Sequence, residues 1–126
     1  MLETTHLLVK PDGVLRGLKH ASQALRDAGI EVRHFSRIRL TETKVRILYP
    51  ERMDDCFKQD VIDYMTSGQC VLLEVEGEDV ISRVKEVKGK TGKSGLRLRF
   101  AQNFIHNTFH CPDTREEVIR ERGIFK

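Results

Sequence analysis

The chain has 126 residues, of which 39% are apolar and 33% charged, and its formal net charge is +3. These values are ordinary for a globular protein and exclude wholesale disorder, so we expect residues 1–126 to form a single domain. No apolar run reaches the length of a membrane span, and no basic-then-apolar leader opens the chain. Three widely spaced cysteines make poor disulfide partners, which predicts a protein of the reducing cytoplasm.

Three elements are predicted in the first forty residues. Residues 5–9 form an apolar strand that ends at Lys-Pro-Asp-Gly, because proline lacks an amide donor and Asp-Gly favours a turn. Apolar residues at helical spacing predict a helix over 18–28, which Gly29 ends. Residues 31–40 alternate and predict a strand with one face exposed to water. One face of that strand would carry Val32, His34, Ser36, Ile38 and Leu40, and the other Arg33, Phe35, Arg37 and Arg39.

The rest of the chain adds helices and two more strands. The predicted elements are a helix from Thr41 to Tyr49, a helix over 54–65, a strand over 70–75, a helix over 79–87, a flexible loop over 88–95, a short strand within 100–109, and a helix over 114–122 capped by Asp113 or Thr114. The resulting alternation of strands and helices favours an α/β sandwich of the ferredoxin-like βαββαβ type, an antiparallel sheet covered by helices.

Positive charge is concentrated between Arg83 and Arg99, a segment that contains seven Lys or Arg residues and one acidic residue. That segment therefore carries +6 and the remainder of the chain −3, a distribution that favours an anionic ligand. Its two Gly-Lys pairs do not form a phosphate-binding P-loop, because Val84 and Val87 stand where that motif needs a glycine. A nucleic-acid surface on this segment is an alternative, which a steep salt dependence would reveal.

His110 is the candidate nucleophile. A neutral imidazole attacks a phosphoryl group without losing a proton, and a carboxylate on its other ring nitrogen fixes the tautomer. Glu121 lies eleven residues later on a predicted helix and could be that carboxylate. His106 and Cys111 could join His110 in binding a metal, but four ligands are needed and no fourth accompanies them. A structural histidine at a strand end is the other alternative.

Other side chains suit a phosphorylated ligand better than a metal. The candidate donors to phosphate oxygens are Lys10, Lys85, Arg97 and Asn107. Tyr49 and Phe57 could provide an aromatic surface for a base, although a phenylalanine such as Phe57 more often belongs to the core. The combination of a histidine, cations and aromatic rings points to nucleotide phosphate chemistry.

Over residues 5–125 the chain resembles the nucleoside diphosphate kinase family, through a set of short segments that occur in the family's order. The matching segments are 6–14 (HLLVKPDGV), 16–18, Tyr49, 64–68 (YMTSG), 76–77, the Asn-x-x-His element 107–110, Glu121 and 123–125. Asn103 and His106 also read Asn-x-x-His. His110 is preferred because it places Phe100, Arg97 and Glu121 at the family's spacings without a gap.

The resemblance implies transfer of the γ-phosphate of a nucleoside triphosphate to a nucleoside diphosphate, by a ping-pong mechanism through a phosphohistidine at His110. It implies Mg²⁺ as cofactor, held mainly by the nucleotide phosphates, and a homo-oligomer. Glu121 would orient the histidine and Phe57 would contact the base. The remaining nucleotide-binding residues would be Lys10, Tyr49, Lys85, Thr91, Arg97 and Asn107.

Several positions depart from the family's pattern. Lys85 and His106 stand in place of arginines, and Pro112 replaces a serine and so removes a hydroxyl partner of Glu121. The family's Arg-Gly-Asp-Phe is here residues 97–100, Arg-Leu-Arg-Phe, after a shortened loop. Pro112 and the short loop favour the alternative function, a catalytically weak or inactive nucleotide-binding relative with a regulatory or protein-interaction role. The presence of His110, Lys10, Asn107 and Glu121 favours the active kinase.

Overall fold

A computed structural model of the chain describes residues 2–13, 17–90, 93–100 and 108–125. Its centre is a four-stranded antiparallel sheet in the order β2-β3-β1-β4, which confirms the predicted ferredoxin-like class. The strands are β1 (Leu2–Val9), β2 (Glu31–Ile38), β3 (Cys70–Glu78) and β4 (Phe109–His110). The helices are α1 (Leu18–Asp27), α2 (Glu42–Leu48), α3 (Lys58–Met65), α4 (Val80–Lys88), α5 (Gly95–Phe100) and α6 (Arg115–Ile124), and 3-10 turns lie at Pro11–Gly13 and Pro50–Arg52.

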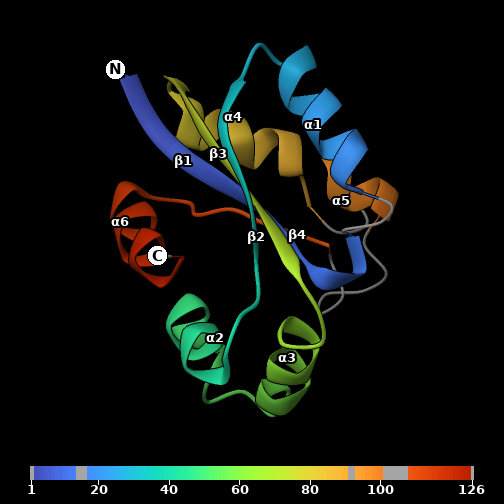
Figure 1. The fold of residues 1–126 in the computed structure, drawn as a ribbon, viewed down its shortest axis with the longest axis vertical. Coiled ribbons are helices and arrows are strands. Elements are labelled where there is room, and N and C mark those ends of the chain that lie inside the picture. Colours follow the sequence, from blue (N-terminus) through green and yellow to red (C-terminus); the bar gives the residue numbers. More distant parts are fainter. Residues whose placement is uncertain (1, 14–16, 91–92, 101–107, 126) are drawn as a thin grey trace.

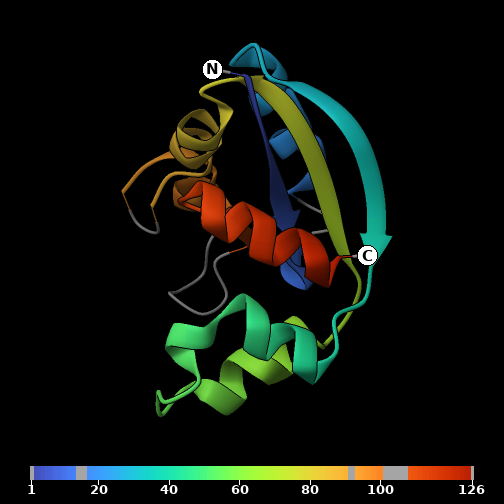
Figure 2. The ribbon, with the colours of Figure 1, turned by 90° about the vertical axis from the view of Figure 1, so that its left-hand side faces the viewer.

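Each face of the sheet carries its own hydrophobic core. Leu7 and Val9 of β1 pack on one face with residues of α1, α4 and α5. Leu8, between them in sequence, points to the opposite face and packs with α2, α3 and α6. Figures 1 and 2 show α2 and α3 as a pair at one end of the sheet, with α6 beside them. In the described residues, every helix is too short or too polar to cross a membrane.

The alternation in β2 is interrupted, so one part of its predicted face assignment is wrong. Val32 pairs with Val75 and Phe35 pairs with Leu73, with a shift of register between Val32 and His34. Such a bulge adds one residue to the strand and reverses the side on which later residues point. Val32 therefore shares a face with Phe35, and not with His34 as strict alternation requires.

Two helices differ from the prediction. α3 begins at Lys58 rather than at residue 54, because Asp55 accepts a hydrogen bond from the amide of Phe57 at 2.6 Å and pairs with Arg52 at 2.9 Å. These local bonds satisfy polar groups outside a helix. α5 lies in a segment for which no helix was predicted, and Gly95 at its start has a φ of +63°.

The glycine stop after α1 and the N-cap of α6 are as predicted, although α6 runs on to Ile124 rather than ending at Arg122. Gly29 follows α1 with a φ of +75°, a conformation that costs glycine little. Thr114 caps α6 by accepting a hydrogen bond from the amide of Glu117 at 3.2 Å. The carboxylate of Glu117 in turn accepts from the amide of Asp113 at 2.7 Å. This capping begins α6 after only four intervening residues, and so brings Glu121 back over the sheet.

Candidate active site

His110 and Glu121 are in direct contact. In β4, His110 pairs with Leu8 of β1, so its ring lies on the α6 side of the sheet, while Phe109 points into the opposite core. Glu121 lies on the inner side of α6 with 1% of its side chain exposed. Oε1 of Glu121 lies 2.8 Å from Nε2 of His110. The predicted pairing of imidazole and carboxylate is therefore present in the fold.

A second imidazole binds the same oxygen. Nε2 of His6, in β1, lies 2.8 Å from Oε1 of Glu121, and the His6 ring packs edge-on against Phe125 at 5.0 Å between centroids. In the sequence, His6 belongs only to the segment 6–14 that carries the family resemblance. Its one signal there is a polar ring inside an otherwise apolar strand, which when buried needs a partner.

The pKa values of His110 and Glu121 are both shifted. Burial would raise the pKa of Glu121, but hydrogen bonds from His110 and His6 outweigh burial and lower it to about 2. Burial lowers the pKa of His110 below 6.5, against the opposing effect of its bond to Glu121. At neutral pH the pair is therefore a carboxylate and a neutral imidazole. Because the carboxylate only accepts, the proton of His110 lies on Nε2 and Nδ1 carries a lone pair.

Tyr49 and Lys10 lie beside the histidine. The ring of Tyr49 packs edge-on against that of His110, with 5.1 Å between centroids. Nζ of Lys10 lies 5.3 Å from the centroid of the Tyr49 ring and 5.9 Å from that of Tyr64. Lys10 is buried, and burial followed by the charge of Arg97 lowers its pKa. The Tyr49 hydroxyl is buried, and among the described residues it has no hydrogen-bond partner.

Cations extend the site toward α4 and α5. Arg97 donates from Nε and Nη2 to the carbonyl oxygen of Phe109, at 3.1 and 2.7 Å, and so lies against the strand that carries His110. Lys85 of α4 pairs with Asp113 at 3.5 Å. A pocket of about 570 Å³ lies here, and Lys85, Lys88, Lys90 and Arg97 are among its lining residues. Glu86 and Asp113 also line this pocket, so four cations and two carboxylates leave it with a net positive charge that suits an anionic ligand.

Asp12 fixes the entry to β4 and was not singled out in the sequence. The hydroxyl of Tyr64 donates to one carboxylate oxygen of Asp12, and that of Thr108 donates to the other at 3.1 Å. The amide of Lys10 also donates to the carbonyl of Thr108 at 2.7 Å. In the sequence, the only sign of this role is that an aspartate directly follows Lys-Pro. In the structure its carboxylate links Tyr64 of α3 to Thr108, the residue before Phe109.

The other candidates are peripheral or undescribed. Phe57 precedes α3 and is 48% exposed, which excludes the alternative interpretation that it belongs to the core. Thr91 and Asn107 lie outside the described residues, as do His106 and Asn103 of the competing register. Among the described residues, the structure thus brings together His110, Glu121, Lys10 and Tyr49, with Arg97 adjoining them.

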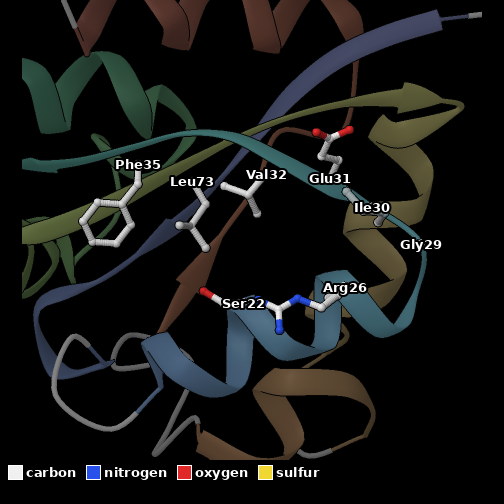
Figure 3. Close-up of a pocket in the computed structure, with 8 residues that line it drawn as sticks. All are labelled: Ser22, Arg26, Gly29, Ile30, Glu31, Val32, Phe35 and Leu73. Atoms are coloured by element: carbon white, nitrogen blue, oxygen red, sulfur yellow. The ribbon is translucent and has the colours of Figure 1, made fainter.

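A separate pocket of about 460 Å³ lies between α1 and β2 (Figure 3). Val32, Phe35 and Leu73 line its sheet side, and Ser22 and Arg26 of α1 face them. Leu73 belongs to the core on the α1 side of the sheet, whereas His110 points to the α6 side. This pocket is therefore not part of the histidine site.

Comparisons with known proteins agree with the resemblance seen in the sequence. The family model described as nucleoside diphosphate kinase matches residues 3–126. A nucleoside diphosphate kinase of Exiguobacterium sibiricum is 34% identical over 130 residues, with 98% of this chain and 94% of the relative covered. One of Desulforamulus reducens is 33% identical over 135 residues, with 98% and 87% covered.

Solved structures give the same result for the fold. The nucleoside diphosphate kinase of Aquifex aeolicus superposes with a TM-score of 0.89 at 27% identity, over 100% of this chain and 96% of that one. The enzyme of Halobacterium salinarum, solved in complex with CDP, superposes with a TM-score of 0.90 at 27% identity, over 100% and 88%. Sequence, fold and relatives therefore agree that this chain belongs to the nucleoside diphosphate kinase family and is a phosphotransferase of that kind.

Proposed function

We propose that this enzyme transfers the γ-phosphoryl group of a nucleoside triphosphate to a nucleoside diphosphate through a phosphohistidine on His110. The supporting observation is the 2.8 Å bond between Nε2 of His110 and Glu121, which leaves the Nδ1 lone pair as nucleophile. Nδ1 forms a bond to the γ-phosphorus, and the bond from that phosphorus to the β–γ bridging oxygen breaks, so the diphosphate leaves with the electron pair. A second diphosphate then takes the phosphoryl group by the reverse step.

The same residues would bind donor and acceptor in turn. Lys10 and Arg97 would neutralise phosphate oxygens, and the buried hydroxyl of Tyr49 is a donor beside His110 that a phosphate could accept from. Lys85, Thr91 and Asn107 would make further contacts to phosphate or sugar. Phe57, half exposed before α3, would stack on the base. Stacking accepts every base, which supports a broad choice of nucleotide.

Mg²⁺ is the proposed cofactor, bound through the phosphates of the nucleotide. When bound, it would neutralise phosphate charge during transfer. In the described part of the chain, no group of three or more His, Cys, Asp or Glu side chains could hold an ion. The Glu121 carboxylate beside His110 is already hydrogen-bonded to two imidazoles. The other neighbours, Lys10 and Tyr49, carry groups that donate hydrogen bonds and so suit phosphate oxygens rather than a protein-bound metal.

The proposed setting is a homo-oligomer in the cytoplasm, built from a single domain over residues 1–126. β2 lies at the edge of the sheet, and Phe35 on it is 51% exposed at the pocket of Figure 3. An open edge with an exposed aromatic ring favours pairing with another chain. Light scattering should show a smaller particle for Phe35→Glu, but not for Ile119→Glu, whose exposed side chain lies on α6. All three cysteines are free, which suits a reducing compartment.

Intact-protein mass after incubation with ATP and Mg²⁺ tests the function. We expect one phosphoryl group that survives base, is lost in acid, and is discharged by added nucleoside diphosphate. It should be absent from His110→Ala and present in His106→Ala. A wild-type protein that binds ATP but takes up no phosphate would instead support the inactive, regulatory alternative.

A further inference from the structure

We propose that His6 is a positioning residue for phosphoryl transfer, which shares the Glu121 carboxylate with His110 and thereby limits how strongly Glu121 stabilises the phosphorylated histidine. This inference rests on the proposed phosphohistidine at His110. It concerns a residue in a different strand, which does not itself touch the reacting atoms.

The sharing is direct. Nε2 of His6 and Nε2 of His110 each lie 2.8 Å from the same oxygen, Oε1 of Glu121. All three side chains are withdrawn from water, with 4%, 12% and 1% exposed respectively. Nη2 of Arg120 lies 3.9 Å from the other carboxylate oxygen, Oε2. Water therefore competes little for Oε1, and the two imidazoles share it.

The protons follow from the contacts. An ionised carboxylate only accepts hydrogen bonds, so both imidazoles must present an N–H at Nε2. The two lone pairs of Oε1 can accept both protons at once. Each N–H then receives part of the negative charge that one imidazole alone would hold.

This division matters most when His110 carries a phosphoryl group. With Nδ1 bonded to phosphorus and Nε2 still protonated, the ring is cationic, and Glu121 is its counter-ion. A carboxylate divided between two donors stabilises that cation less than an undivided one would. His6 thus keeps Glu121 in place while leaving the phosphoryl group easier to pass on.

Other charged groups lie near these residues. They are Glu74, opposite His6 on β3; His34, opposite Glu74 on β2; Arg122 of α6, in a pocket that His6 also lines; and Lys10, which opposes a positive charge on His110. Only His6 and His110 hydrogen-bond to Oε1 of Glu121 within the described residues. A substitution of His6 should therefore act on His110 mainly by changing the hydrogen bonding of the Glu121 carboxylate.

Three variants test the proposal, each compared with wild type at fixed ATP:ADP ratios. His6→Phe removes the donor and keeps a ring, His6→Gln keeps an N–H donor, and His34→Phe makes the same exchange at an exposed histidine of β2. We expect His6→Phe to raise the equilibrium ratio of phosphorylated to free enzyme by about three- to tenfold and to slow discharge to ADP. Its pH midpoint for phosphorylation should also rise, because an undivided Glu121 favours protonated His110. His6→Gln and His34→Phe should match wild type.

A folded His6→Phe with the wild-type ratio, discharge rate and midpoint would overturn the proposal, as would equal effects of His6→Phe and His6→Gln. If His6→Phe does not fold, nitrogen-15 NMR of the imidazoles in wild type decides. A proton on Nε2 of His6 that shifts when His110 is phosphorylated supports the proposal, and a proton on Nδ1 alone contradicts it. Wild type that takes up no phosphoryl group overturns the proposed function itself, which separates the two failures.

Discussion

Thr108 donates a hydrogen bond from its hydroxyl to Oδ2 of Asp12, at 3.1 Å. Thr108 has a φ of +71°, an unfavourable conformation for a β-branched residue, so the contacts around it must hold the backbone there. Asp12 is also bonded to Tyr64, and the chain enters β4 directly after Thr108. The position of His110 therefore depends on a carboxylate almost a hundred residues earlier.

Asp12→Ala should lower both stability and activity. Two hydrogen bonds to a charged group are lost, which should reduce the free energy of unfolding by about 2 kcal/mol. His110 should shift, and the rate of phosphorylation should fall by about 10- to 100-fold. Urea unfolding and single-turnover labelling measure the two effects. Asp27→Ala, which loses only an exposed bond from Gln23, is the matched control and should leave both unchanged.

The depressed pKa of Glu121 makes stability depend on pH in a defined window. Its pKa of about 2 lies below the ordinary value of 4.5, so ionisation contributes stability above pH 4.5 that is lost as the pH falls toward 2. The contribution is roughly 3 kcal/mol. Subtracting the unfolding curve of Glu121→Gln from that of wild type should show this loss. A flat difference between pH 4.5 and 2 would contradict the shift.

Phosphorylation should stay fast at neutral pH and decline only in acid. Burial lowers the pKa of His110 below 6.5, so Nδ1 keeps its lone pair at pH 7 and gains a proton only at lower pH. In Glu121→Gln the carboxylate that opposes this shift is gone, and the acid midpoint should move lower still. Rapid-quench labelling across pH gives the midpoints. A Gln variant with a higher midpoint than wild type would rule out this electrostatic account.

Lys10→Met should weaken nucleotide binding without unfolding the protein. The lysine is buried with a lowered pKa, so its charge is costly to the fold and useful to an anionic ligand. Calorimetry should give an ADP affinity about 10- to 100-fold lower, with unchanged or higher thermal stability. The exposed Lys19 on α1 offers the comparison, since Lys19→Met should bind ADP as wild type does.

The thiols should divide into one reactive and two inert groups. Burial raises the pKa of Cys70 to about 12 and that of Cys111 to about 11, whereas Cys56 is exposed. Iodoacetamide at pH 8 should therefore add one group to the folded protein and three to the unfolded one. Rapid alkylation of Cys111, next to His110, would show that this strand opens to solvent.

The parts of the fold that the sequence could predict are those with local causes. The apolar runs of β1 and β3, the stop at Gly29 and the cap at Thr114 each depend on residues a few positions apart. The bulge in β2 could not be predicted, because both faces of that strand carry mixed side chains and favour no single register. α5 was missed because its alternating Leu and Arg residues give no helical apolar face.

The site divides in the same way. Glu121 was found from its spacing to His110 in a known family, and the buried contact between the two fits that pairing. His6 could not be found, because its partner lies 115 residues away and is brought to it only by the packing of α6 on the sheet. The burial of Lys10 and the exposure of Phe57 likewise depend on how the elements pack together, which the local sequence does not reveal.

β4 consists of two residues and is held to β1 by two residue pairs. Because neighbouring strand residues point to opposite faces, a slip of one position would bury the imidazole among the aliphatic side chains under α4 and turn the phenyl ring of Phe109 toward Glu121. The sheet would then remain intact, but His110 would lose its contact with Glu121 and the proposed phosphoryl transfer would stop. The side of the sheet that His110 faces is thus decided at the shortest of the described strands, where amide hydrogen exchange should detect opening first.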